Sequence, residues 1–197
     1  MNVTSEIDRA VGKIRRARRD GDLEAVILGL QHGDIVSRRV AARSLGLMGD
    51  NRAREPLQRV LESHDELLQA TALKALGRLG DVEAIPAIAE IANTRAAFAV
   101  RTNAIEALLI LGDRRGIRLL TEIATTNSFD STWNVAGKMP AVSERPGRTW
   151  ALKKLLEHRG VEAIASLESY RQSSLDLVSR LRVRYVLWRL RRFRTEA

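Results

Sequence analysis

Three histidines are the residues of this sequence best suited to metal or acid–base chemistry, but their spacing supports neither. His32, His64 and His158 are scattered along the chain, whereas metal ligands come in short, regular spacings. There is no cysteine, so thiolate metal sites and disulfides are excluded. The sequence also lacks a Gly-Lys-Ser/Thr phosphate loop, a Gly-x-Ser-x-Gly motif and a His-Glu-x-x-His motif. We therefore predict no catalytic residue, no metal and no cofactor, and a non-enzymatic protein.

Arginine side chains form the second set of groups with recognisable chemistry. Residues 180–194 contain seven arginines, and apolar residues recur among them and just before them at helical steps. These apolar residues are Val178, Leu181, Tyr185, Leu187, Trp188, Leu190 and Phe193. An amphipathic basic helix either caps the end of the fold or contacts phosphates. The candidates for phosphate contact are Arg180, Arg184, Arg189, Arg191, Arg192 and Arg194.

The charge of the chain is concentrated at its ends. The net charge is +9 over 197 residues, and it divides into +3 for residues 1–20, −1 for 21–125 and +7 for 126–197. The N-terminal share comes from a basic cluster at 9–19, which we interpret as a terminal cap. A near-neutral middle between basic ends predicts that any surface for an anionic partner lies at the termini. Nucleic acid is the alternative partner on this basis, and an anionic membrane surface is a less favoured one.

A repeat of about 31 residues organises the middle of the chain. A Gly-Asp pair recurs at Gly49, Gly80 and Gly112, with spacings of 31 and 32 residues, and a partial copy begins at Gly21. A further upstream position holds Arg38, Gln69, Arg101 and Arg148 in successive copies. Agreement at several positions in several copies indicates one structural unit, used repeatedly.

Each unit is predicted to be a pair of helices. Asp34 and Asp65 are placed to cap the first helix of two units. Apolar residues then follow at helical spacing, at 36, 40, 41, 45 and 47 in one unit and at 68, 72, 73, 76 and 79 in the next. The glycine ends this helix in the left-handed conformation. The following Asp caps the second helix, and Pro56 or Pro86 lies in its first turns.

This pattern resembles the short HEAT-like repeats of the phycobilisome-lyase type. The family pattern is approximately Asp-x-x-Val-Arg-x-x-Ala-Ala-x-Ala-Leu-Gly-x-Leu-Gly-Asp-x-x-Ala-x-x-Pro-Leu, and residues 34–61 and 65–91 match it best, with a looser copy at 96–124. The resemblance implies an all-α fold, a right-handed α-solenoid of HEAT-like helical hairpins with basic terminal helices. We expect one domain over 1–197. Its predicted parts are an N-terminal basic helix at 1–20, regular repeats at 21–125, an inserted loop at 126–147, and a degenerate repeat with a basic C-terminal helix at 148–197.

The recurring polar residues have a structural explanation under this resemblance. Asp50, Asp81 and Asp113 are expected to form hydrogen-bond ladders between neighbouring repeats with the arginines of the upstream column. Gln69 replaces arginine once in that column. The ladder is therefore predicted to be interrupted at Gln69.

The inserted loop at 126–147 displays two aromatic residues, Phe129 and Trp133. Long loops within compact repeats are uncommon and often functional. These two residues are candidates for contact with a partner. The alternative is that the loop is variable and that Trp133 folds back onto the solenoid.

The predicted function is that of a protein-binding scaffold with a concave surface lined by the second helices. The candidate contact residues on that surface are Arg52, Arg59, Glu83, Glu90, Arg115 and Glu122. Their mixed charge suits a protein partner better than a phosphate track. The alternatives are nucleic-acid binding through the basic terminal helices, and a subunit of a lyase or other modifying enzyme, which rests on fold analogy alone.

Composition agrees with a helical protein. Hydrophobic residues make up 45% of the chain and aromatic residues only 4%, which favours helix-on-helix packing. There is no run of about 18 consecutive apolar residues, and the first residues do not form a signal peptide. We therefore expect a cytoplasmic protein.

Overall fold

The computed structural model describes residues 3–94, 97–125, 146–158, 161–172, 183–188 and 191. Every regular element in these ranges is helical and none is a strand, which confirms the all-α prediction. The chain folds into two compact units, Met1–Asp113 and Arg114–Ala197, and each is described by itself. The loop candidates Phe129 and Trp133 lie outside the described residues.

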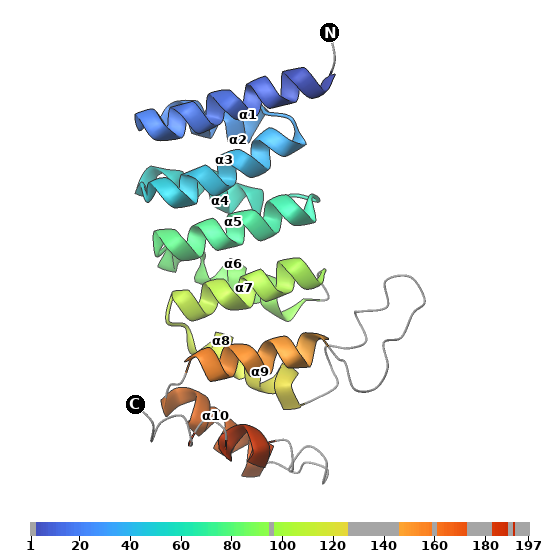
Figure 1. Ribbon diagram of the computed structural model, residues 1–197. Helices are drawn as coiled ribbons and strands as arrows, with labels where there is room; N and C mark the ends of the chain where they lie inside the picture. The colour runs from blue at the N-terminus through green and yellow to red at the C-terminus, as the bar shows by residue number, and fades with distance from the viewer. Residues whose placement is uncertain are drawn as a thin grey trace. The chain divides into compact units, whose positions relative to one another are not determined.

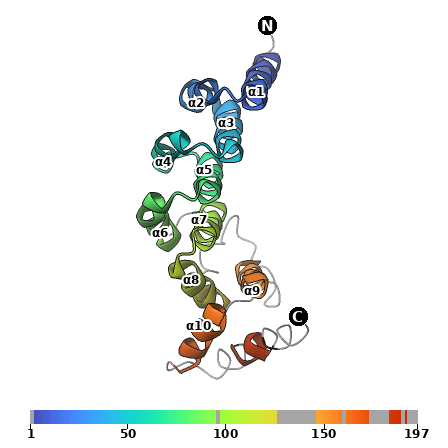
Figure 2. The same ribbon diagram turned by 90° about the vertical axis from the view of Figure 1, so that its left-hand side faces the viewer.

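The first unit is an α-solenoid of two helical layers. The A layer consists of α1 (Val3–Asp20), α3 (Ile35–Met48), α5 (Glu66–Leu79) and α7 (Phe98–Ile110). The B layer consists of α2 (Leu23–His32), α4 (Arg54–Val60) and α6 (Ile85–Asn93). Each A helix packs against the next A helix, and each B helix packs against the A helix that follows it. The A helices run in the same direction (Figure 1), and the layers form two columns (Figure 2).

Glycines in the left-handed conformation end the A helices. Gly21, Gly49, Gly80 and Gly112 have φ values of 75°, 72°, 67° and 73°, a region that side chains with a Cβ rarely adopt. The backbone N–H of Asp113 then donates to the carbonyl of Leu108 at 2.9 Å, and equivalent bonds follow Gly21 and Gly80. These bonds satisfy carbonyls that the helix end would leave unpaired. The predicted turns are confirmed, and Gly21 is a full member of the series.

Aspartates begin two of the A helices, α3 and α5, as predicted. The Asp34 carboxylate accepts hydrogen bonds from the N–H groups two and three residues later, at 2.9 and 3.0 Å. Asp65 accepts the same two bonds at 3.1 and 3.2 Å. Each carboxylate thus satisfies two of the free donors at a helix N-terminus.

The B helices begin with a tighter turn than the sequence predicted. A 3₁₀ turn precedes the α-helix in two of them, η1 (Asn51–Ala53) before α4 and η2 (Val82–Ala84) before α6. The Asp50 and Asp81 carboxylates accept from the N–H two residues later, at 2.9 and 3.2 Å. The predicted caps are therefore present, and the turn that each of them begins is a 3₁₀ turn.

The A helices approach most closely at two glycines. A Cβ built on Gly46 of α3 would lie 2.7 Å from Cα and Cβ of Ala75 in α5, and one built on Gly77 would lie 3.2 Å from Ala107 Cα. Small residues at these positions let the helix backbones come together. Two of the apolar residues that follow the helical spacing, Val36 and Leu47, are not in the core of this layer. They are 40% and 51% exposed, because the outward side of α3 has no helix over it.

Helix α1 differs from the later A helices on one side. Arg9, Lys13 and Arg16 are exposed and stand at the register positions that are buried in α3, α5 and α7. In α5, those positions are Leu68, Ala72 and Ala75. A polar outer face is what a terminal repeat needs. This register supports the interpretation of α1 as a cap.

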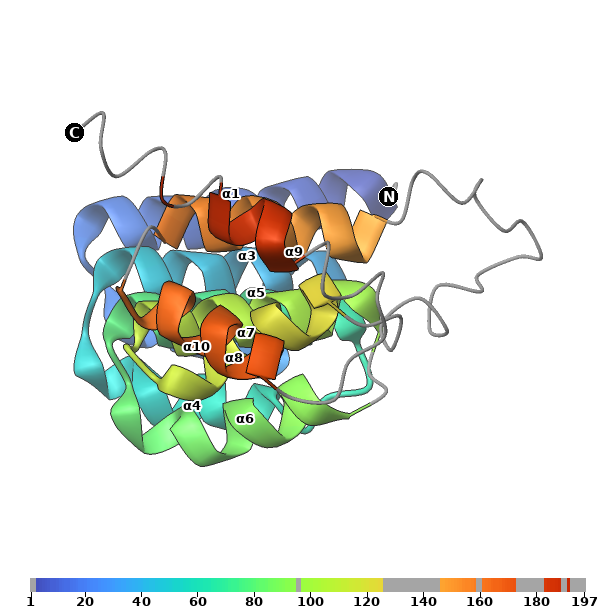
Figure 3. The same ribbon diagram turned by 90° about the horizontal axis from the view of Figure 1, so that it is seen from below.

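The second unit contains α8 (Arg114–Thr125), α9 (Pro146–His158), α10 (Val161–Gln172) and a helical segment at 183–188. Helix α8 packs with α9 and with α10 (Figure 3). Val183, Val186 and Leu187 are buried with Leu167 of α10. A helical segment that covers α10 is the capping role considered for the basic C-terminal helix.

The sequence assigned Tyr185 and Trp188 to the apolar stripe of that helix, and this prediction is wrong. They are 52% and 55% exposed and stack on each other, with ring centroids 6.2 Å apart. The buried side of the segment is Val183, Val186 and Leu187, of which only Leu187 was among the predicted apolar residues. These three residues repeat at steps of three and one, so the helix is rotated relative to the stripe inferred from the sequence.

Candidate functional site

Four of the predicted contact residues lie in the B layer of the first unit. Arg52 in η1 and Arg59 in α4 are exposed, and so are Glu83 in η2 and Glu90 in α6. The other two, Arg115 and Glu122, lie on α8 in the second unit. Four of the six candidates therefore share one layer of one unit.

The B-layer cations are already neutralised by nearby carboxylates. The Arg52 guanidinium lies 2.8 Å from the Asp50 carboxylate and 3.8 Å from that of Glu24. Its hydrogen bonds lower the pKa of Asp50 below the ordinary range. Arg59 pairs with Glu55 one turn earlier on α4. The outcome is a surface on which both signs of charge alternate.

Asp81 links two B helices from a buried position. Its side chain is fully buried, its Oδ1 caps η2, and its Oδ2 accepts a hydrogen bond from Gln58 Nε2 of α4 at 2.7 Å. Arg54 Nε lies 4.0 Å from the same carboxylate. The predicted ladder between neighbouring repeats is present at Asp81, but its partners come from α4 and not from the arginine column.

The arginine column has a different role from the one predicted. Arg38 Nε donates to the Leu30 carbonyl at 3.0 Å, and Arg101 Nε donates to the Ala92 carbonyl at 2.9 Å. Gln69 Nε2 makes the equivalent bond to the carbonyl of Leu61. The column therefore caps the end of each B helix, and Gln69 does not interrupt it, because an amide N–H serves as well as a guanidinium. The Arg148 side chain lies outside the described residues.

One ion pair ties α3 to the start of α5. Arg39 donates to both oxygens of Asp65, from Nη2 at 2.7 Å and from Nε at 3.1 Å. These bonds are the main cause of the lowered pKa of Asp65, and the backbone bonds at the helix start lower it further. The cap of α5 is thereby held in place by the preceding A helix.

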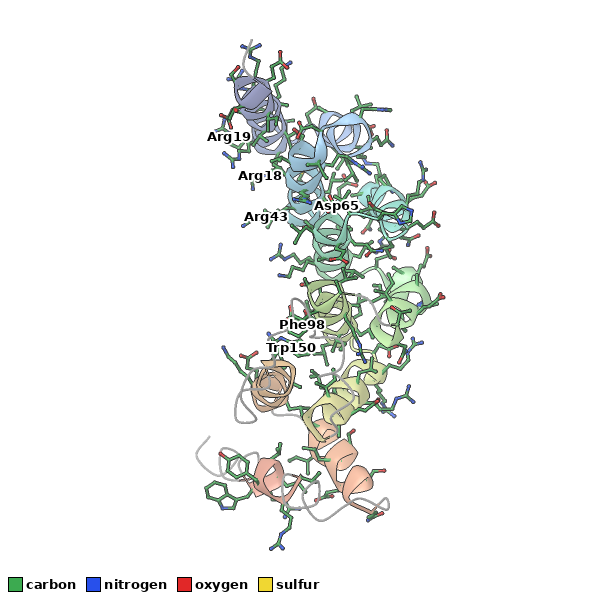
Figure 4. The ribbon with its side chains drawn as sticks, turned by 90° about the vertical axis from the view of Figure 1, so that its right-hand side faces the viewer. Arg18, Arg19, Arg43, Asp65, Phe98 and Trp150 are labelled. Carbon is green, nitrogen blue, oxygen red and sulfur yellow. The ribbon has the colours of Figure 1, made fainter. Side chains whose placement is uncertain are left out.

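The remaining A-layer cations behave differently from those of the B layer. Within the part of the chain that the structure describes, Arg15 and Arg19 of α1, Arg43 of α3, and Lys74 and Arg78 of α5 are exposed and make no hydrogen bond or ion pair. Arg18, Arg19 and Arg43 lie on the side of the A layer that faces away from the B helices (Figure 4). Arg9, Lys13, Arg16 and Arg18 of α1 are exposed and unpaired among the described residues as well. We call Arg15, Arg19, Arg43, Lys74 and Arg78, which share two register positions, the A-layer basic face.

The N-terminal basic cluster was visible in the sequence, but Arg43, Lys74 and Arg78 were not predicted as part of a surface. Their positions within the repeat show that they share a helix side with Arg15 and Arg19. Arg15, Arg43 and Lys74 each stand six residues before a left-handed glycine, and Arg19 and Arg78 stand two before one. Positions six and two before the glycine are one turn apart, so they lie on the same side of the helix.

The C-terminal arginines are only partly described. Arg184 is exposed, and Arg191 pairs with Glu168 of α10. Arg180, Arg189, Arg192 and Arg194 lie outside the described residues. The pairing of Arg191 means that one of the six phosphate candidates is already engaged within its own unit.

Neither a metal centre nor a membrane span is found in the described ranges. No three His, Asp or Glu side chains there are grouped so that they could hold a metal ion. None of the helices there combines the length and the apolar character needed to cross a bilayer.

Comparison with known proteins identifies the repeats. Residues 23–108, from the start of α2 to the last turns of α7, match the family model of HEAT repeats. No curated protein matches the chain. The match covers the helix pairs whose turns and caps are described above, so the chain is a HEAT-like repeat protein in this part.

Proposed function

We propose that this array of HEAT repeats is a non-enzymatic scaffold that binds a protein partner through its B layer. HEAT repeats commonly serve as protein-interaction scaffolds. The observation that carries the proposal is the mixed charge of this layer, where Arg52 and Arg59 are paired with carboxylates and Glu83 and Glu90 are exposed. Surfaces with both signs of charge complement the similarly mixed surfaces of other proteins.

Exposed aliphatic side chains add to this proposal. Leu28 of α2 and Val82 of η2 are 55% and 60% exposed. Exposed apolar groups supply contact area in an interface, in which a few desolvated residues dominate the affinity. The B layer therefore offers apolar contacts as well as charged ones.

The frame that holds this layer is preorganised. The buried Asp81 fixes α4 to η2, and Arg38, Gln69 and Arg101 fix the ends of the B helices to the A layer. A surface held in this way loses little conformational entropy on binding. The B layer would therefore bind its partner without a large change in conformation.

The proposal is tested by locating the partner and then measuring its affinity. A photo-crosslinking residue at Val82 should capture a partner that the same residue at Leu47, on the A layer, does not. The captured protein is then purified and titrated by calorimetry against the double variant Glu83→Lys/Glu90→Lys. We expect its affinity to fall at least tenfold, because two exposed charges on the contact surface are reversed.

A matched control separates this effect from a change in net charge. The variant Glu6→Lys/Glu66→Lys reverses two exposed carboxylates of the A layer and should keep the affinity within twofold. Equal loss in both variants, or crosslinking from Leu47 alone, would place the partner elsewhere and end the proposal.

A further inference from the structure

The A-layer basic face distributes five cations over three helices, with exposed aliphatic side chains such as Leu47 between them. Arg15, Arg43 and Lys74 occupy the same register position on α1, α3 and α5, which pack side by side. Packed helices lie about 8–10 Å apart, so these three charges span about 20 Å across the layer. Arg19 and Arg78 extend the surface by one turn toward the C-terminal ends of α1 and α5.

The charge of the A-layer basic face indicates that its partner is negatively charged. The A helices carry twelve Arg and Lys residues against five Asp and Glu, whereas the B helices with their 3₁₀ turns carry three against four. The cations of the B layer are paired with carboxylates, while those of the A-layer basic face have no partner among the described residues. An array of unpaired cations matches a ligand of uniformly negative charge.

We propose that the A-layer basic face binds the phosphate backbone of duplex nucleic acid. Arginine supplies four of its five residues, and guanidinium groups bind phosphate oxygens in bidentate fashion. A surface of a protein partner usually carries both signs of charge, whereas a duplex presents only negative charge at high density. This surface is separate from the B-layer site and does not depend on it.

The face also predicts which nucleic acid is preferred. Helices α1, α3 and α5 contain no aromatic residue, so the face has no platform on which an unpaired base could stack. Backbone contacts alone carry no sequence information. Binding should therefore be independent of sequence and stronger for a duplex than for a single strand.

The A-layer basic face does not extend onto α7. Glu106 of α7 stands at the register position of Arg15, Arg43 and Lys74. A carboxylate there repels phosphate, so the contact is confined to α1, α3 and α5. Asp20 of α1 follows Arg19 in the sequence and reduces the positive electrostatic potential there. We therefore expect Arg43 and Lys74 to contribute most to phosphate binding.

The test measures how binding depends on salt. Full-length protein is titrated into a labelled 20-base-pair duplex by fluorescence anisotropy at about 50, 100 and 200 mM salt. Each phosphate contact contributes about 0.9 to the slope of log affinity against log salt. The variant Arg43→Gln/Lys74→Gln should therefore lower the slope by about 2 and weaken binding on the order of 50-fold at about 100 mM salt.

The control variant is Arg118→Gln/Lys153→Gln, which removes one arginine and one lysine that are exposed on the second unit. It should leave both slope and affinity within twofold of the parent. Circular dichroism checks that both variants keep their helix content, as expected for exposed side chains.

Four results would overturn the proposal. They are an unchanged slope in Arg43→Gln/Lys74→Gln, equal losses in the control, tighter binding of single-stranded DNA than of the duplex, and equally tight, equally Arg43-dependent binding of a poly-glutamate peptide. The last result would assign the face to an acidic protein. Any of them leaves the B-layer proposal standing, because that proposal is tested with Glu83→Lys/Glu90→Lys and a protein partner.

Discussion

Replacing Gly46 by alanine tests whether close helix approach holds the A layer together. The new Cβ would lie 2.7 Å from both Cα and Cβ of Ala75, about 1 Å inside ordinary van der Waals contact. One of the two atoms is backbone, so no side-chain rotation relieves the clash, and α3 and α5 must move apart. Overpacking of this kind costs about 1–3 kcal/mol.

The helix propensity of alanine acts in the opposite direction. Alanine is more favourable than glycine inside a helix by about 1 kcal/mol. Because the clash is with backbone, the cost of overpacking lies in the upper part of its range, about 2–3 kcal/mol. We therefore expect Gly46→Ala to lower the free energy of unfolding by about 1–2 kcal/mol and the melting temperature by roughly 2–8 °C. Urea and thermal unfolding followed by circular dichroism measure both quantities.

Gly77→Ala is the matched comparison within the same chain. Its Cβ would lie 3.2 and 3.3 Å from Cα and Cβ of Ala107, so a shift of a few tenths of an ångström suffices. The propensity gain then offsets the packing cost, and we expect a change within about 0.5 kcal/mol of zero. Amide hydrogen exchange should show faster opening of α3 and α5 in Gly46→Ala alone. A Gly46→Ala protein at least as stable as the parent would refute this account of the layer.

Two further predictions concern the polar contacts. The Asp65 pKa is lowered by its bonds to Arg39, so the stability from this group is present above the unfolded pKa and is lost as the pH falls through it toward the lower folded value. Urea midpoints should therefore fall less between about pH 5 and pH 2.5 in Asp65→Asn than in the parent, and parallel curves would contradict this assignment. At the capping column, Gln69→Arg should keep the bond to the Leu61 carbonyl and change the free energy of unfolding by less than about 0.5 kcal/mol, whereas Gln69→Leu should cost about 1 kcal/mol. Equal midpoints for the two Gln69 variants in urea would show that this bond does not contribute.

The helix ends were predictable from the sequence because they depend on local chemistry. The left-handed glycines at 49, 80 and 112 and the caps at Asp34 and Asp65 involve residues within five positions of one another. The repeat then shows each such signal several times. The 3₁₀ turns after Asp50 and Asp81 were missed, because a cap residue marks where a helix begins and not how tightly it starts.

Contacts between helices were harder to predict. The register of Arg38, Gln69 and Arg101 was visible in the sequence, but their acceptors are backbone carbonyls, which leave no mark on the residue pattern. Because the acceptors were not recognised, Gln69 was predicted to interrupt the column, although its amide N–H makes the same bond as the arginines. The exposure of Leu47 could not be predicted, because helical spacing identifies an apolar residue but not which side of the helix a neighbour covers.

The A-layer basic face cannot be recognised from the net charge of successive regions of the sequence. Residues 21–125 have a net charge of −1, yet within that range α3, α5 and α7 carry six basic and two acidic residues, while the remaining positions carry seven and twelve. A solenoid alternates its layers every half-repeat, so a sum over the whole region cancels the basic residues of the A helices against acidic residues of the B helices, the turns and α8. The basic residues of the A layer become visible when the charged residues are compared at the same position of successive repeats. The charge that decides which partner can bind is that of a layer: the A helices carry twelve basic and five acidic residues, whereas the B helices with their 3₁₀ turns carry three and four.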